Sequence, residues 1–512
     1  MNTKRYLPVL LALLLFNPAC REDALERENP NAPTEGTYYK TEGDFIRASN
    51  AIYATIQKLE LFGSYLQYNY DLRGDEYQPT FKTDQDADLQ QLQRFTLNPA
   101  NSYVTGYWRY LYEGVYRSNI LLDKIRDARF NEVRRGRIEG EAKFLRAFCY
   151  YHLTSLFGDV PLFTDAAAQK GYPAGRTPKA QVQAQMIADW TDAKTLLPTP
   201  AEWGPGELGR ATRGAAGAFL GKLYLTLGRY ADARDELAAV VNTGTYSLVP
   251  DYRSNFSEGS ENNAESVFEI QYRNLNRGDV WGGGQSQDGA DVNESNMVSF
   301  LYGVPQGQGW NLQPSEVLVG AFEPGDPRKR ATVFFAGGDS LRNLDDKLIA
   351  YDSPGYGSRK YLDNTARLPG YGGPFSGINI RVMRYAEVLL LYAEALNETD
   401  GPAAALPYLN QVRERVDMPP YPTPGFPAAS KDDVFRILMH ERMVELGGEQ
   451  KRWLDLVRWD DNGKIDLNAY IRNAPQESLR RPNFNKQVHK LLPIPQSELD
   501  INPNLRPQND GY

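Results

Sequence analysis

Cysteine and histidine are scarce in this sequence, and their scarcity excludes several kinds of chemistry. The 512 residues include two cysteines and three histidines, His152, His440 and His489, which lie far apart in the chain. Zinc sites and Ser-His or Cys-His catalysis need such residues at defined spacings. The pair His440-Glu441 also lacks the second histidine of a metalloprotease helix. We therefore expect no metal, no cofactor and no catalytic residue.

Long apolar runs are equally rare. One apolar run, Tyr6–Phe16, follows a short cationic head and ends shortly before Cys20. This run is too short to span a membrane and is typical of a signal peptide, here residues 1–19. Cys20 follows a small residue and resembles a lipoprotein acceptor, so we expect a lipid anchor there and a flexible tether over residues 20–40. Because Cys149 is the other cysteine, no intramolecular disulfide is expected.

Basic side chains are fewer than acidic ones in this sequence. The chain carries 57 basic and 65 acidic side chains, and loss of Lys4 and Arg5 with the signal peptide changes the net charge from −8 to −10. Nucleic-acid binding depends on basic surface that neutralises phosphates. We expect no nucleic-acid partner.

Amphipathic helices dominate the rest of the sequence. Phe144, Ala147, Phe148 and Tyr151 recur at the spacing of one helix face and predict an apolar stripe. The sequence Gly158-Asp-Val-Pro should end this helix, because proline cannot continue it.

Two stretches have the spacing of a tetratricopeptide repeat. In residues 220–237, small residues such as Gly221 allow two helices to approach, and large residues fill the groove between them. A looser copy covers residues 384–412. Because a lone copy cannot bury its apolar face, we expect about four stacked helix pairs, with residues 103–127 and 138–157 among them.

Residues 251–380 differ in character. Glycine, proline and short β-type runs such as 266–272 and 331–335 replace the helical periodicity. Long loops inside a compact protein are usually functional. We therefore place most ligand contacts in this region.

Five blocks of sequence then point to a known family. They comprise residues 140–161, 218–248, 384–413, 441–458 and 488–512. The last block joins a proline-locked strand to a polar Asn/Pro/Gly-rich tail, which needs a body to dock on. These blocks, in this order and after a lipoprotein start, resemble the SusD/RagB family of nutrient-binding lipoproteins of the bacterial outer membrane.

The resemblance implies a mostly α fold, in which a tetratricopeptide-like helical-repeat scaffold supports an irregular, loop-rich, short-strand ligand lobe. It also implies a SusC-like TonB-dependent outer-membrane transporter as partner, and a location at the outer membrane. The expected divisions are residues 1–19, 20–40, a helical part over 41–250, the ligand lobe over 251–380, and the C-terminal repeats and tail over 381–512.

Charged residues on two C-terminal segments admit two interpretations. Glu441, Arg442 and Glu445, with Arg452, Asp455 and Arg458, have opposite charges at helical spacing. A catalytic carboxylate pair is conceivable. We favour an ion network between helices, because helices place such pairs on one face.

Two tryptophans lie in glycine-rich sequence, Trp281 in 281–284 and Trp310 in 307–311. Residues 281–284 lack the Lys-Ser/Thr of a phosphate loop. Exposed rings stack on sugars or on extended peptides, unless both indoles pack inward. A tyrosine-rich cluster over residues 65–77 has a similar composition, with a helix core as the alternative. The expected ligand-binding residues are Trp281, Trp310, Asn311, Tyr302, Tyr77, Arg73 and Asp75.

The sequence thus predicts non-catalytic capture of a nutrient, with an oligosaccharide as the favoured ligand, and its delivery to the transporter. An oligopeptide receptor of the same architecture is the main alternative. A helical-repeat glycoside hydrolase and a scaffold that binds only protein are two others. None of the proposed ligand residues lies in the five family blocks, so the resemblance assigns them no role.

Changing Cys20 to Ala tests the anchor. The variant has no thiol to accept a diacylglycerol, so lipid labelling should be lost and the protein should leave the membrane fraction. Labelling with a radioactive fatty acid, followed by fractionation, measures both. A variant that stays membrane-bound and carries lipid would show that the anchor lies elsewhere.

Overall fold

The computed structural model describes residues 38–80, 86–171, 173–273, 295–302, 312–335, 340–342, 348–350, 356–362 and 376–512. Cys20, Trp281, Trp310 and Asn311 lie outside these residues, as does the expected signal peptide.

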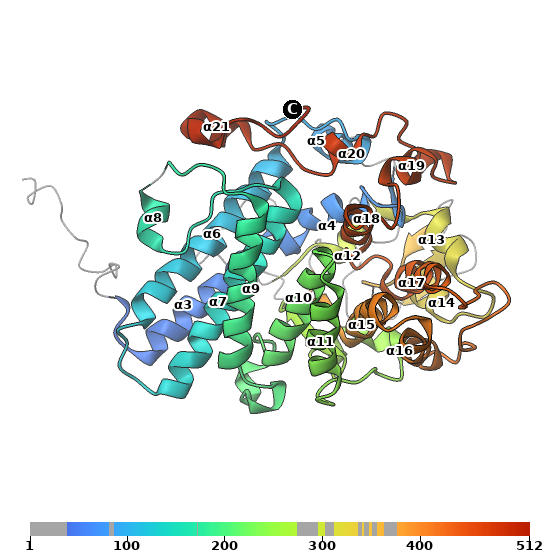
Figure 1. Cartoon of the computed structure of the whole chain (residues 1–512), viewed down its shortest axis with the longest axis horizontal. Helices are drawn as coiled ribbons and strands as arrows, with labels where there is room; N and C mark the ends of the chain where they lie inside the picture. The colour runs from blue at the N-terminus through green and yellow to red at the C-terminus, as the bar shows by residue number, and fades with distance from the viewer. Residues whose placement is uncertain are drawn as a thin grey trace, which may run out of the picture.

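Helices form most of the described chain (Figure 1). Up to residue 250 they are α3 Glu42–Ile56, α4 Tyr65–Asp71, α5 Ala87–Arg94, α6 Ser102–Ile125, α7 Glu132–Phe157, α8 Ala166–Lys170, α9 Lys179–Leu196, α10 Arg213–Thr226 and α11 Tyr230–Val241. Beyond it they are α12 Val298–Leu301, α13 Glu316–Ala321, α14 Arg328–Thr332, α15 Tyr385–Thr399, α16 Pro402–Glu414, α17 Lys431–Leu446, α18 Arg452–Asp461, α19 Leu467–Arg472, α20 Lys486–His489 and α21 Gln496–Ile501.

Side-chain caps fix where several helices begin. Thr41 forms a capping box with Asp44 at the start of α3, and Ser430 forms one with Asp433 at the start of α17. The side chain of Asn131 accepts from the backbone of α7. These polar groups satisfy backbone donors that a helix start leaves without partners.

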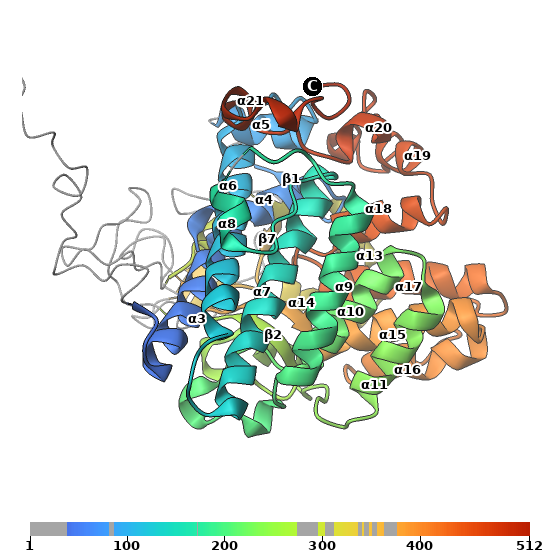
Figure 2. The same cartoon turned by 60° about the vertical axis from the view of Figure 1, so that its left-hand side comes forward.

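The long helices fold back on one another in chain order (Figures 1 and 2). Helix α6 packs on α7, α7 on α9, α9 on α10, and α10 on α11; α11 packs on α15, which packs on α16 and α17. The segments predicted to pair, 220–237 and 384–412, form α10 with α11 and α15 with α16. The prediction of a mostly helical fold is confirmed.

A cluster of phenylalanines joins the helices to a strand. Phe144 and Phe148 of α7 lie 5.6 Å, centroid to centroid, from Phe219 of α10. They also lie 4.9 and 5.8 Å from Phe268, which belongs to strand β2 Ser266–Ile270. The apolar stripe predicted for α7 is therefore buried, as expected. Gly158, with φ +74°, ends α7 as predicted.

The strands are short and bring distant segments together. They are β1 Tyr77–Pro79, β2, β3 Leu312–Pro314, β4 Val333–Phe335, β5 Ser340–Arg342, β6 Leu348–Ala350, β7 Tyr356–Ser358 and β8 Ile380–Arg384. Each sheet is an antiparallel pair: β1 with β3, β2 with β8, β4 with β7, and β5 with β6. Most strands fall between residues 251 and 380, as the fold class predicted. The domain boundaries themselves stay a prediction.

The C-terminal tail docks on the helical body, but the strand expected within it does not form. Residues 491–495 belong to no sheet, because Pro493 and Pro495 supply no backbone donor. Leu492 instead donates its backbone N–H to Leu156 O of α7 at 2.7 Å. The side chain of Asn509 donates to Phe157 O at 3.0 Å, so the tail caps the end of α7.

Within the described ranges, none of the helices combines the length and apolar character needed to cross a bilayer.

Gly221 tests the close approach of α10 and α11. A Cβ on Gly221 would lie 2.6 Å from Leu237 Cγ, so Gly221→Ala forces the helices apart, at a cost of about 1–3 kcal/mol of unfolding free energy, partly offset by the higher helix propensity of alanine. The matched control is Gly136→Ala in α7, where the new Cβ meets only Leu196 at 3.4 Å. Urea unfolding should show a net loss for the first variant and none for the second. Equal stability of the two variants would refute the close-packing account.

Candidate ligand-binding site

Three tyrosines form a buried platform, which we call the tyrosine base: Tyr77, Tyr302 and Tyr361. The Tyr302 ring lies edge-on to Tyr77 and tilted on Tyr361, at 5.2 Å in both cases. The Tyr77 hydroxyl hydrogen-bonds with Ser358 Oγ at 3.1 Å, and the Tyr361 hydroxyl donates to Gly448 O at 2.9 Å. The base thereby joins β1, α12, β7 and the segment after α17.

The base gathers segments that are far apart in sequence. Tyr302 is the last described residue before the segment 303–311, and β3 is the first described element after it. Strand β3 pairs with β1, and Pro314 lies opposite Tyr77. Ser299 Oγ donates to Tyr361 O at 2.8 Å. The described flanks of the 303–311 segment, which carries Trp310 and Asn311, thus lie on the tyrosine base.

The two flanks of the segment that carries Trp281 are joined to each other. Ser295 Oγ donates to Arg273 O at 2.9 Å and holds the two flanks together. The adjoining Asn296 exchanges backbone hydrogen bonds of 2.9 and 2.8 Å with Ser376. Asn296 leads directly into α12 and so to Tyr302, which connects the C-terminal flank of the Trp281 segment to the tyrosine base through one short helix.

Two buried carboxyl groups next to the tyrosine base, Asp71 and Glu76, have raised pKa values. Burial raises the pKa of Asp71 to about 7, although a hydrogen bond from the Tyr302 hydroxyl and the charges of Lys451 and Lys360 oppose the shift. Burial likewise raises the pKa of Glu76 to about 8, with Arg452 acting in the opposite direction. Both carboxyls therefore hold a proton more readily than exposed carboxyls do.

Four of the predicted ligand residues have buried side chains. Tyr77 and Tyr302 are fully buried in the tyrosine base. Arg73 lies 4.3 Å above the Trp453 ring and donates to Lys490 O at 3.2 Å. Asp75 accepts from Arg452 Nε at 2.8 Å. The structure brings Tyr77 and Tyr302 together, whereas Arg73 and Asp75 connect the segment between α4 and β1 to the C-terminal helices.

Trp281, Trp310 and Asn311 lie outside the described residues, and the ligand role of all seven predicted residues stays a prediction. Sequence reasoning missed Tyr361, because no periodicity or motif marks it. A cavity of about 710 Å³ beneath the C-terminal tail was also missed. In the described part of the chain, no group of three His, Cys, Asp or Glu side chains is placed to hold a metal ion.

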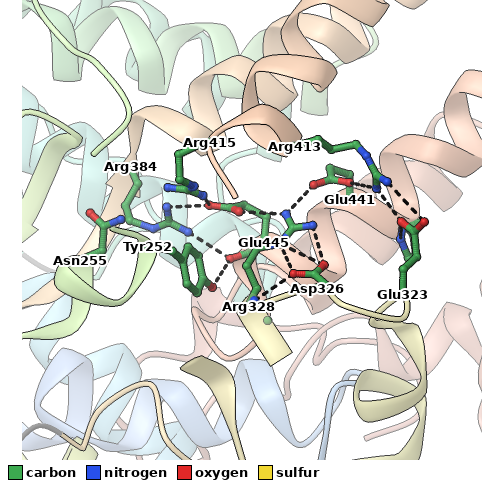
Figure 3. A network of polar contacts seen from close by, with 12 residues as sticks. Tyr252, Asn255, Glu323, Asp326, Arg328, Arg384, Arg413, Arg415, Glu441 and Glu445 are labelled. Carbon is green, nitrogen blue, oxygen red and sulfur yellow. Dashed lines mark hydrogen bonds and ion pairs between the residues drawn. The ribbon is translucent and has the colours of Figure 1, made fainter. Parts of the chain in front are cut away.

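The charged residues of α17 form a buried ion network (Figure 3). Glu441 accepts from Arg328 Nη1 at 2.5 Å and from the Tyr421 hydroxyl at 2.8 Å. Glu445 accepts from Arg415 Nη2 at 2.6 Å and from Arg384 Nη1 at 3.0 Å. These contacts join α17 to α14, to β8 and to the end of α16.

This network leaves little scope for acid–base catalysis by Glu441 and Glu445. Both side chains are completely buried. Burial alone would raise the pKa of Glu445, but the guanidinium groups of Arg415, Arg384 and Arg328 outweigh it and hold the pKa well below its ordinary value. A carboxylate paired in this way has no proton to donate and no substrate surface to reach.

A second network confirms the helix-to-helix interpretation. Arg442 of α17 donates to both carboxylate oxygens of Asp455 in α18, at 2.7 and 2.9 Å. Arg458 of α18 donates to Glu394 of α15 at 2.7 Å and to Asp455 at 3.0 Å. The predicted pairs therefore hold three helices together.

Comparisons with known proteins agree with this architecture. Residues 264–512 match the family model described as SusD family, and residues 37–225 match a model described as starch-binding associating with outer membrane. The chain is 29% identical to SusD-like protein P2 of Formosa agariphila, over 99% of this chain and 100% of that protein.

Solved structures show the same likeness. A laminarin-binding SusD-like protein is 26% identical, with a TM-score of 0.74 over 93% of this chain and 100% of its own. A SusD superfamily protein of Bacteroides vulgatus matches with the same identity, coverage and TM-score. The class is thus that of helical, glycan-binding proteins associated with the outer membrane. The chain belongs to the SusD/RagB family.

Asp71 tests the electrostatics beneath the base. Its pKa rises from 3.8 unfolded to about 7 folded, so its contribution to stability is present below about pH 4 and is lost as pH rises to 7. The loss approaches roughly 1.4 kcal/mol per pH unit. Asp71→Asn removes this titration. The unfolding free energy of the variant, relative to that of the wild type, should therefore increase from pH 5 to pH 7. Asp432→Asn, a change of an exposed carboxylate, is the control and should show no such increase. Parallel pH profiles of stability for the wild type and Asp71→Asn would disprove the raised pKa of Asp71.

Proposed function

We propose that this protein binds an oligosaccharide nutrient at the cell surface, without converting it, and delivers it to a TonB-dependent outer-membrane transporter. The observation that carries the proposal is the position of the segment flanks. Those of residues 303–311 lie on the tyrosine base, and the C-terminal flank of the Trp281 segment leads through α12 to Tyr302. This position supports one binding surface built by the segments that carry Trp281 and Trp310. Indole rings there would stack on sugar faces, while neighbouring polar groups such as Asn311 bind the hydroxyls.

Two further points support an oligosaccharide as the ligand. The family includes starch-binding proteins, and a similar solved structure binds laminarin. The burial and arginine pairing of Glu441 and Glu445 support binding without hydrolysis. The ligand would therefore leave the site unchanged.

Delivery rests on the anchor and the partner. Lipidation of Cys20 would hold the protein at the outer membrane, and the tether would let it open and close over a barrel transporter as a lid. The transporter partnership is implied by family membership. Gentle detergent extraction should recover the two proteins as one complex, and recovery of the lipoprotein alone would count against this part of the proposal.

Trp281→Ala and Trp310→Ala test the site. Loss of one stacked indole removes about 0.5–1.5 kcal/mol beyond its buried area, so affinity should fall roughly tenfold or more. The melting temperature should barely change. Calorimetric titration with laminarin, a starch oligosaccharide and an oligopeptide mixture, with reducing ends assayed in parallel, measures affinity and conversion.

A core tryptophan provides the control. Trp459 is fully buried, so Trp459→Ala should lower the melting temperature and leave the affinity of the folded fraction unchanged. If the two loop variants behave like Trp459→Ala, their indoles belong to the core. Saturable binding of the peptide mixture alone would identify an oligopeptide receptor, and growth of reducing ends with time would identify a hydrolase.

A further inference from the structure

The C-terminal tail crosses one end of the helical layer (Figures 1 and 2). A cavity lies between the tail and these helices. It encloses about 710 Å³, within the range of small-molecule sites, and we call it the tail cavity. The C-terminal end of α7, the N-terminal end of α9, helix α18 and residues 486–510 line it. It shares no lining residue with the tyrosine base.

Charges in the tail cavity are arranged by depth. Its acidic residues Asp159, Asp461 and Asp510 are exposed, as is Arg506, whereas Arg176 and Lys179 are partly buried. Arg458 is buried beneath them. In a chain whose net charge is −8, this interior is unusually rich in cationic side chains.

Several of these cations are already neutralised. Lys490 pairs with Asp460 and Asp461, each at 2.5 Å, and Lys486 pairs with Asp460 at 2.8 Å. Arg458 pairs with Glu394 and Asp455. The positive charge that lacks a paired carboxylate therefore belongs to Arg176 and Lys179 inside the cavity and to the exposed Arg506.

Arg176 bonds only to neutral oxygens of the described chain. Its guanidinium donates to Asp159 O at 2.9 Å, to Pro507 O at 2.8 Å and to the side chain of Asn509. These bonds hold the tail. The guanidinium forms no ion pair within the described residues; burial lowers its pKa, although Asp159 and Asp510 act in the opposite direction. An anion that enters the cavity meets a guanidinium that is already oriented.

Lys179 has no hydrogen bond or ion pair through its ammonium group within the described residues. Burial lowers its pKa, although Asp461 acts in the opposite direction and Lys490 adds to the lowering. The Ser155 hydroxyl and the Gln487 side-chain amide, which also line the cavity, likewise make no hydrogen bond among the described residues. A half-buried ammonium group without a partner is unfavourable unless a ligand supplies the opposite charge.

We propose that the tail cavity is a second binding site, which takes a small sugar bearing a carboxylate or sulfate group. Lys179 binds the anionic group with the support of Arg176, and Ser155 and Gln487 bind hydroxyls. The volume is larger than a simple inorganic anion requires, and the free hydroxyl and amide suit a polyhydroxylated ligand. The site is independent of the proposed function of the tyrosine base.

Titration of the mature protein with glucuronic acid, glucose 6-sulfate, glucose and inorganic sulfate tests the proposal. Glucose should not bind at this site. At least one acidic sugar should bind saturably and more tightly than inorganic sulfate. The difference in affinity between glucuronic acid and glucose 6-sulfate shows whether the site prefers a carboxylate or a sulfate group. Lys179→Gln should weaken that binding at least tenfold, because a charge-assisted hydrogen bond is lost. Lys179 is chosen because it holds no part of the tail.

Lys40→Gln, a change of an exposed lysine outside the cavity, is the matched control and should bind like the wild type. Mass spectrometry should also show that the bound sugar protects Lys179 from acetylation. The melting temperature confirms that each variant is folded. The proposal is overturned if neither acidic sugar binds saturably, if Lys179→Gln binds with unchanged affinity, or if inorganic sulfate binds as tightly as the sugars.

Discussion

The neutralisation of Glu445 by arginines is the interaction on which the C-terminal half depends. A bare carboxylate at a fully buried position of α17 would be strongly unfavourable, and Arg384, Arg415 and Arg328 remove that penalty while each comes from a different part of the chain. Removing one partner of such a buried pair typically costs about 3–5 kcal/mol. The network therefore selects a single arrangement of α17 against its neighbours.

The same network extends to the tyrosine base. Arg384 also pairs with Glu449, and Glu449 accepts from Lys360 Nζ at 2.8 Å. Lys360 precedes Tyr361, whose hydroxyl bonds to the backbone just after α17. Charges buried in the scaffold thus fix the position of the tyrosine base.

The sequence predicted what is encoded locally. The α7 stripe, the end of that helix at Gly158 and the small residue at Gly221 are all set by neighbours within a few turns. The contact between the Tyr302 hydroxyl and Asp71 joins residues 231 positions apart, and no periodicity encodes it. Tyr361 and the tail cavity escaped notice for the same reason. The strand expected near Pro493 does not form, because its prolines cannot donate the backbone hydrogen bonds of a sheet. Tertiary contacts hold the backbone instead.

The docking of the tail on α7 has a consequence for how the protein reaches its native state. Asn509 caps Phe157 across a separation of 352 residues, and a Cβ at Gly158 would lie 2.8 Å from Leu491. Contacts between residues so far apart in sequence form late in folding, because the intervening chain must be ordered first. Helix α7 therefore keeps an open end until residues 491–509 have emerged and folded. Docking of this segment is thus the step that completes the scaffold.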